Sequence, residues 1–118
     1  MRSKEVLSKY FWHDSLVEKL EYDENKNVVT IWVELGNWRQ EGYKESEPEN
    51  LECVLKFSGV SNFQHEPEEL IYNDDEILSF EVIDVTDSNE DELKLVLLGN
   101  SDTKVISFNS NDATIDFS

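Results

Sequence analysis

Short apolar segments that alternate with polar residues recur along most of this chain, and polar turns separate them. Such a period of two is typical of strands with one buried face. No segment between them is long enough for the helical crossover that parallel strands need. The pattern therefore predicts a mainly β fold, an antiparallel sheet or sandwich built from hairpins. We expect about seven strands, at residues 15–22, 28–35, 51–58, 77–82, 93–97, 103–109 and 113–117.

Two segments favour short helices. Residues 3–11 place four apolar side chains at helical spacing, and Ser3 would cap the first turn. Pro67 is followed by two glutamates and suits the first turn of a second helix. Residues 36–50 carry a proline and many charges, so we expect an acidic surface loop there.

The chain has 118 residues, which is the usual size of one domain, and we treat residues 1–118 as a single domain. Its net charge is −17. Residues 36–76 hold eleven acids and three bases, and residues 77–118 hold nine and two. A protein of this charge is repelled by nucleic acid and by anionic lipid. The charge indicates either plain solubility or a surface that meets a basic partner.

Cys53 is the only cysteine, so no internal disulfide can form. It alternates with Leu55 and Phe57, which favours a buried thiol over a nucleophile. Met1 to Glu5 lead into no apolar signal region, and no apolar run is long enough to cross a bilayer. We expect a cytoplasmic protein that does not bind membranes.

His13 and Asp14 are the residues best suited to acid–base chemistry. On extended chain, however, neighbouring side chains point to opposite faces. The structural alternative is that Asp14 or Ser15 accepts hydrogen bonds from backbone amides while His13 packs among aromatic rings. A ligand pocket would have to add His65. We expect no metal site and no cofactor, because the two histidines lack ligand spacing and the glycines form no phosphate loop.

Aromatic and acidic side chains together are typical of a surface that docks on a basic protein. Trp12 and Trp32 are more typical of the core. Trp38 and Tyr43 lie in the polar segment and are the best anchors for a partner. The charges expected to surround them form two groups, which are Glu45, Glu47 and Glu49, and then Asp74, Asp75 and Glu76.

The opening stretch from Phe11 to Ser15, with its Trp12-His13-Asp14-Ser15 motif, is followed by a hairpin, and later by Phe57-Ser58-Gly59-Val60 and Phe63. Together these resemble a broad group of small acidic bacterial proteins that includes immunity proteins encoded beside polymorphic toxins. The resemblance implies a cytoplasmic, single-domain protein that binds and blocks a toxin without catalysis. It supplies no shared motif of binding residues.

Three hypotheses follow. The first is a non-catalytic binding protein whose acidic face neutralises a basic toxin domain. The second is a ligand-binding or enzymatic domain that uses His13, Asp14 and His65. The third is a structural subunit that forms a homodimer through its strand edges.

Overall fold

The computed structural model describes residues 2–69, 74–85, 90–99 and 102–117. These residues form one antiparallel sheet of eight strands, a short α-helix and a 3-10 turn, so the predicted mainly β class is confirmed. The elements in chain order are α1 (Ser3–Ser8), β1 (Leu16–Asp23), β2 (Val28–Gly36), η1 (Asn37–Arg39), β3 (Asn50–Ser58), β4 (Ser61–Glu66), β5 (Asp75–Val85), β6 (Asp91–Leu98), β7 (Thr103–Ser110) and β8 (Asp112–Phe117).

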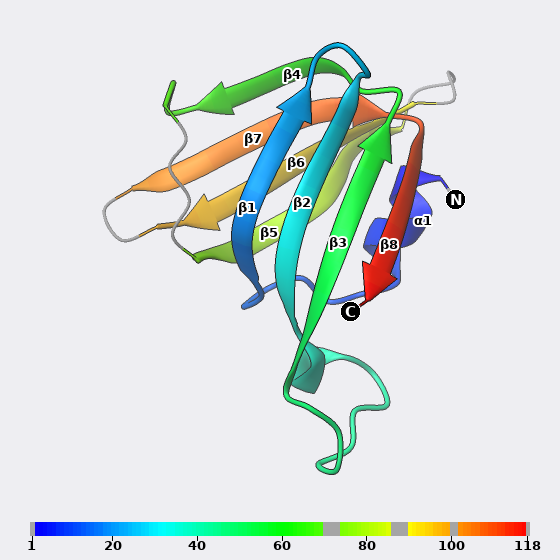
Figure 1. Ribbon diagram of the computed structural model, residues 1–118, viewed down its shortest axis with the longest axis vertical. Helices are drawn as coiled ribbons and strands as arrows, with labels where there is room; N and C mark the ends of the chain where they lie inside the picture. Colours follow the sequence, from blue (N-terminus) through cyan, green and yellow to red (C-terminus); the bar gives the residue numbers. More distant parts are fainter. Residues whose placement is uncertain (1, 70–73, 86–89, 100–101, 118) are drawn as a thin grey trace.

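The sheet has the strand order β4-β7-β6-β5-β1-β2-β3-β8. Most neighbours are joined along their length, but β1 and β5 pair only at Leu16 with Glu76 and at Val17 with Asp75. At this short seam the sheet folds over, so that β1, β2, β3 and β8 cross in front of the other four strands (Figure 1). The prediction of a sheet or a sandwich thus resolves as one sheet folded on itself.

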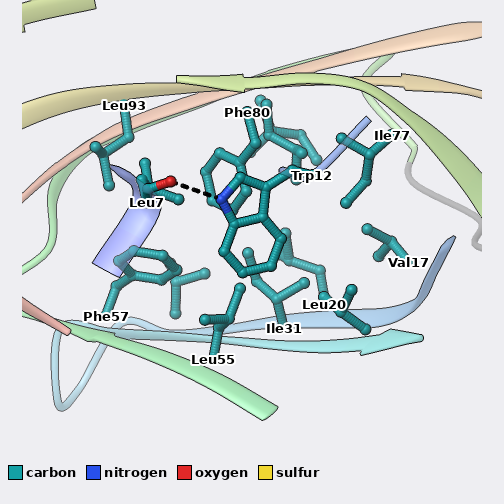
Figure 2. Packing of buried hydrophobic residues seen from close by; sticks show 14 of the residues in the cluster. Leu7, Trp12, Val17, Leu20, Ile31, Leu55, Phe57, Ile77, Phe80 and Leu93 are labelled. Carbon is teal, nitrogen blue, oxygen red and sulfur yellow. Dashed lines mark hydrogen bonds between the residues drawn. The ribbon is translucent and has the colours of Figure 1, made fainter. Parts of the chain in front are cut away.

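The core lies between the two halves of this folded sheet, where their apolar side chains face each other (Figure 2). Helix α1 contacts β5 in one half of the sheet and β8 in the other. Trp12 follows the helix and is 4% exposed. Its indole ring lies 5.8 Å from the ring of Phe80 and 5.6 Å from that of Tyr10. The N-terminal segment therefore completes the core.

Helix α1 ends at Ser8, so the predicted extension to residue 11 is wrong. A longer helix would need the amide of Phe11 to donate to the carbonyl of Leu7. That carbonyl instead accepts from the indole Nε1 of Trp12 at 2.9 Å, and the Phe11 amide donates to the Gln40 side chain. Burial of the tryptophan thus overrides the helical pattern.

The predicted cap at Ser3 is also wrong. Ser3 lies inside the helix, and its hydroxyl donates to the hydroxyl of Ser110 at 2.9 Å. Asp91 binds this end of the helix instead, because its carboxylate accepts from the amide of Lys4 at 3.0 Å and pairs with Arg2 at 3.1 Å. The helix start is fixed by a residue almost ninety positions away.

Bulges shift the alternation in two strands. In β1 the register slips between Val17 and Lys19. Alternation predicts that Leu16 and Leu20 share the buried face; Leu20 is buried, but at the start of the strand Val17 is buried and Leu16 only half-buried. In β5 the register slips between Ile77 and Ser79, and Ile77 is buried while Leu78 is only half-buried. A bulge adds one residue to one strand, which moves later side chains to the other face.

The segment around Pro67 differs from its prediction. Residues 61–66 form β4, an outer strand that pairs with β7, and residues 67–69 are bends. The helix expected to begin at Pro67 is therefore absent from residues 64–69, and residues 70–73 lie outside the described part. Gly59 makes the turn between β3 and β4 with φ of +61°, as expected for a glycine bend.

A buried ion pair reinforces the seam. Asp75 and Lys104 are 2% and 4% exposed, and their side chains form a hydrogen-bonded salt bridge. Lys104 also donates to Asp102 at 3.2 Å. Burial disfavours the charged amine, but the hydrogen bonds and charges of the two aspartates outweigh it and raise the pKa of Lys104. β7 is thereby tied to the strand that meets β1.

We predict that Lys104→Met lowers the free energy of unfolding by about 3–5 kcal/mol, because it leaves a buried carboxylate without its cation. The double variant Asp75→Asn with Lys104→Met should lose less than the single one. Urea unfolding monitored by fluorescence measures both. A single-variant loss below about 1 kcal/mol would contradict this role.

Replacing Trp12 with Phe should also destabilise the fold, by about 1–3 kcal/mol, because it removes the hydrogen bond to Leu7 and leaves a small cavity. The control is Trp32→Phe, at a half-buried position on the outer face of β2. The same unfolding experiment compares the two. Equal losses of unfolding free energy in the two variants would show that Trp12 contributes no more to stability than Trp32 does.

Candidate functional site

The corner before β1 joins three parts of the sheet. The Ser15 amide donates to the Trp12 carbonyl at 3.0 Å, which closes a turn. Ile77 on β5 donates to the carbonyl of Ser15 at 2.7 Å and accepts from the amide of Asp14 at 3.0 Å. The Ser15 hydroxyl oxygen accepts from the amide of Gly36 at 2.9 Å, as predicted for this serine. The corner thus fixes β1, β5 and the end of β2 together.

His13 and Asp14 lie in this turn and not on extended chain, so their side chains are not forced to opposite faces. Asp14 has φ of +72°, and its Oδ1 lies 3.0 Å from Nδ1 of His13. The imidazole is half-exposed, which overturns the expectation that it packs among aromatic rings. Arg39 approaches both residues, with Nη2 3.2 Å from the imidazole Nδ1 and Nε 3.5 Å from Asp14 Oδ2.

Beside the corner, the outer face of the sheet carries a row of carboxylates across four strands. Leu16 pairs with Glu76 on one side and with Glu34 on the other, and Glu34 pairs with Glu52. Two more acids flank Leu16 along the chain, and one precedes β5. We call this set the carboxylate belt; its members are Asp14, Glu18, Glu34, Glu52, Asp74 and Glu76.

One pair in the carboxylate belt links it to the corner. A hydrogen bond between the side chains of Asp14 and Glu76 lowers the pKa of Asp14, and His13 and Arg39 add to this effect. The same hydrogen bond raises the pKa of Glu76. Two carboxyl groups within hydrogen-bonding reach share a proton more readily than they both ionise. Within this pair, the proton therefore resides more on Glu76 and the negative charge more on Asp14.

The second pair lies on β1 and β3. A hydrogen bond with Glu18 is the largest cause that raises the pKa of Glu52 to about 7, and burial and the charges of Glu18, Glu34 and Asp74 raise it further. Glu52 is nevertheless exposed. An exposed carboxyl group that keeps a proton near neutral pH indicates strong local negative potential. A cation brought to this surface would relieve that repulsion.

The loop between β2 and β3 leaves the sheet at the same end as the carboxylate belt (Figure 1). Trp38 on η1 is 47% exposed, and Tyr43 is half-buried. The Trp38 amide donates to the Glu49 carbonyl at 3.1 Å, and Glu47 accepts from the amide of Lys44 at 2.9 Å. The predicted acids of this loop are all exposed; they are Glu45, Glu47 and Glu49.

The second predicted acidic group divides. Asp74 is exposed and Glu76 is half-buried, and both belong to the carboxylate belt. Asp75 is buried in its ion pair with Lys104, so its assignment as a surface charge is wrong. The reason is the strand itself, since alternate residues of β5 point to opposite faces of the sheet.

His65 lies away from the corner. It is on β4, its Nδ1 is 2.9 Å from the carbonyl of Pro67, and its ring is 5.7 Å from that of Phe63. Phe63 stacks on Tyr22 near the far end of β1, whereas His13 precedes the near end. A strand of eight residues spans roughly 25 Å. The arrangement gives no support to a pocket shared by the two histidines.

Cys53 is buried, as predicted, and burial raises the pKa of its thiol to about 12, with smaller effects from Glu52 and Glu18. A thiol held in this form is a poor nucleophile. Within residues 2–69, 74–85, 90–99 and 102–117, no three His, Cys, Asp or Glu side chains are grouped so that they could hold a metal ion. No helix among them is long and apolar enough to cross a membrane.

Comparison with known proteins places the architecture but not the activity. Neither a scan of protein-family models nor a search of curated proteins found a match. Among solved structures, the crystal structure of an uncharacterised protein from Neisseria gonorrhoeae is similar, with a TM-score of 0.53 and 13% identity. The alignment covers 90% of this chain and 93% of that one. At this identity the likeness shows the fold alone.

Sequence reasoning missed several residues of the site. Glu18, Glu34 and Glu52 stand singly in apolar strands, and nothing in the order of residues shows that they face one another. Phe11 is one of the four apolar side chains at helical spacing in residues 3–11, yet it is 60% exposed. The sequence held one indication of this row. Glu34 and Glu52 are acidic residues in two consecutive predicted strands, and consecutive strands commonly pair.

The protonated Glu52 leads to a prediction about pH. The folded chain holds this proton more tightly than the unfolded chain, so the contribution of Glu52 to stability falls as pH rises from about 4.5 to about 7. Glu52→Gln should therefore stabilise the protein at pH 8, by about 0.5–1 kcal/mol once solvent screening is allowed for. The gain should shrink at pH 4.5, where the native side chain is already neutral.

Thermal or urea unfolding of both proteins across this pH range measures the effect. The control is Glu66→Gln, which removes an exposed carboxylate from the edge strand β4, outside the carboxylate belt. An equal, pH-independent gain in both variants would point to the overall charge and not to the carboxylate belt.

Proposed function

We propose that this protein is a non-catalytic binding domain whose carboxylate belt docks on a basic protein. The observation that carries the proposal is the row from Glu76 through Leu16 and Glu34 to Glu52, which crosses the outer face of four strands. Among the described residues, two basic side chains lie within 4 Å of a carboxylate of the belt. They are His13 and Arg39, and both lie beside Asp14. A basic partner supplies the charges that this surface lacks.

The electrostatics also suit fast and specific association. A net charge of −17 repels nucleic acid and steers a basic protein towards the surface from a distance. Trp38 and Tyr43 lie at the same end and supply contact area that slows release. The loop acids Glu45, Glu47 and Glu49 extend the negative field beyond the sheet.

The more specific form of the proposal is an immunity protein that neutralises a toxin domain such as a nuclease. It is supported by the resemblance of the Trp12-His13-Asp14-Ser15 stretch to small acidic bacterial proteins of that kind. A surface that binds nucleic acid is basic, so an acidic domain can cover it. Such a protein would act in the cytoplasm, without a cofactor, by occlusion of the toxin's active site.

Affinity capture from the native host tests the proposal. The bait is the wild-type protein, beside a belt variant in which Glu18, Glu34 and Glu52 are replaced with Gln. A control variant carries Glu66→Gln, Glu81→Gln and Glu92→Gln, which removes the same number of carboxyl groups from β4, β5 and β6. Proteins are captured at low and at moderate salt and identified by mass spectrometry.

We expect one basic protein to bind the wild type and the control, to be weakened by salt, and to bind the belt variant at least about tenfold more weakly, which corresponds to about 1.4 kcal/mol. Co-expression should then protect cells if that protein is a toxin. Equal binding by the belt and control variants would contradict docking at the carboxylate belt.

A further inference from the structure

The corner beside the carboxylate belt exposes two aromatic rings, and hydrogen bonds fix the backbone segments that carry them. Phe11 is 60% exposed and Trp38 is 47% exposed. The Gln40 side chain joins their two segments, because it accepts from the Phe11 amide at 2.9 Å and donates to the carbonyls of Phe11 at 2.8 Å and Gly36 at 2.9 Å. Exposed rings on a fixed backbone lose little entropy when a partner binds them.

The Trp38 segment is fixed from its other side as well. The Asn37 side chain donates to the carbonyl of Pro48 at 2.8 Å, and the Trp38 amide donates to that of Glu49. A Cβ atom on Gly36 would lie 3.4 Å from the indole Nε1 of Trp38. The indole therefore rests against the backbone, and its orientation does not depend on a partner.

A guanidinium group already lies over this ring. Arg39 Cζ is 5.4 Å from the centre of the Trp38 ring, within the range of a cation–π contact. Its nitrogens reach the imidazole of His13 at 3.2 Å and Asp14 Oδ2 at 3.5 Å. The corner thus offers an aromatic face and a carboxylate to the same planar cation, which is how arginine is recognised in proteins.

The contacts of Arg39 are nevertheless loose. Its nearest carboxylate distance is longer than the 2.7–2.9 Å typical of a paired guanidinium. The Nδ1 atom of His13 lies near both Arg39 and Asp14, and it can accept from one or donate to the other, but not both. The Arg39 side chain is 38% exposed. An incoming guanidinium with better geometry can displace it.

We propose that His13, Asp14, Trp38 and Glu76 form a subsite for an arginine side chain of the basic partner, and that Arg39 occupies it in the free protein. This inference rests on the proposed function and names the side chain recognised there. Glu34 on β2, Glu52 on β3 and Asp74 before β5 add negative charge to the same surface. Trp38 and Asp14 favour arginine over lysine, because a planar guanidinium can lie flat on the indole and still present a fixed fork of donors to the carboxylate, whereas an ammonium is a compact point charge.

Two capped peptides, Gly-Arg-Arg-Arg-Gly and Gly-Lys-Lys-Lys-Gly, test the selectivity on the intact protein. Their binding is followed by NMR of the three indole N–H signals and the backbone amides at low salt. We expect the Trp38 indole and the Gln40 amide to shift with the arginine peptide. Its affinity should exceed that of the lysine peptide about two- to fivefold, the size of one cation–π contact on an exposed ring.

Three variants separate the subsite from general attraction. Trp38→Ala should remove the preference for arginine, and the control Trp32→Phe should retain it; an unchanged Trp12 indole signal verifies the fold of each. Asp14→Asn should weaken the arginine peptide more than the lysine peptide. Arg39→Gln should raise the ratio of arginine to lysine affinity, because the competing side chain is gone.

The outcomes distinguish the two proposals. Equal affinities for both peptides, with shifts confined to the strands of the carboxylate belt, would overturn the arginine subsite and leave docking on a basic protein intact. No shift with either peptide would overturn the subsite as well, and the capture experiment would still decide the proposed function. A lower ratio of arginine to lysine affinity after Arg39→Gln would show that Arg39 contributes to binding and does not compete with the partner's arginine.

Discussion

The fold depends on a short seam. β1 and β5 pair through only two residue pairs, yet this is where the sheet folds over and its halves enclose the core. Backbone hydrogen bonds between the Trp12–Ser15 corner and Ile77 extend the seam beyond the strands. The buried Asp75–Lys104 ion pair adds a link to β7. Val17, Ile77, Asp75 and Lys104 are all buried, so water does not compete for the contacts that they make.

The same corner places the candidate site on the outer surface. Because Asp14 must turn with a positive φ, its carboxylate lies beside His13 and reaches Glu76 across the seam. Because Ser15 binds the amide of Gly36, the turn η1 begins directly beside the corner and presents Trp38 and Arg39. Structural requirements inside the molecule therefore decide which charges and rings meet outside it.

The carboxylate belt has a cost for the free protein. Like charges close together repel, and here the pairs Glu18–Glu52 and Asp14–Glu76 share hydrogen bonds that leave Glu52 and Glu76 with raised pKa values. A surface under no other demand would place lysines among them, as Lys19 beside Glu21 does elsewhere on β1. Repulsion that a partner can relieve is a natural basis for selective binding of basic proteins.

Much of the fold could be predicted from local patterns. Alternation predicted the buried faces of β3 and β6, where Leu55 and Leu95 are both buried, and polar turns located the hairpins. The sequence alone also determined the charge, the lone buried cysteine and the exposed Trp38. Tertiary structure decided the bulges of β1 and β5, the early end of α1 and the burial of Asp75. It also decided the meeting of Glu34, Glu52 and Glu76 in one row, because register between strands depends on contacts between distant residues that no local period encodes.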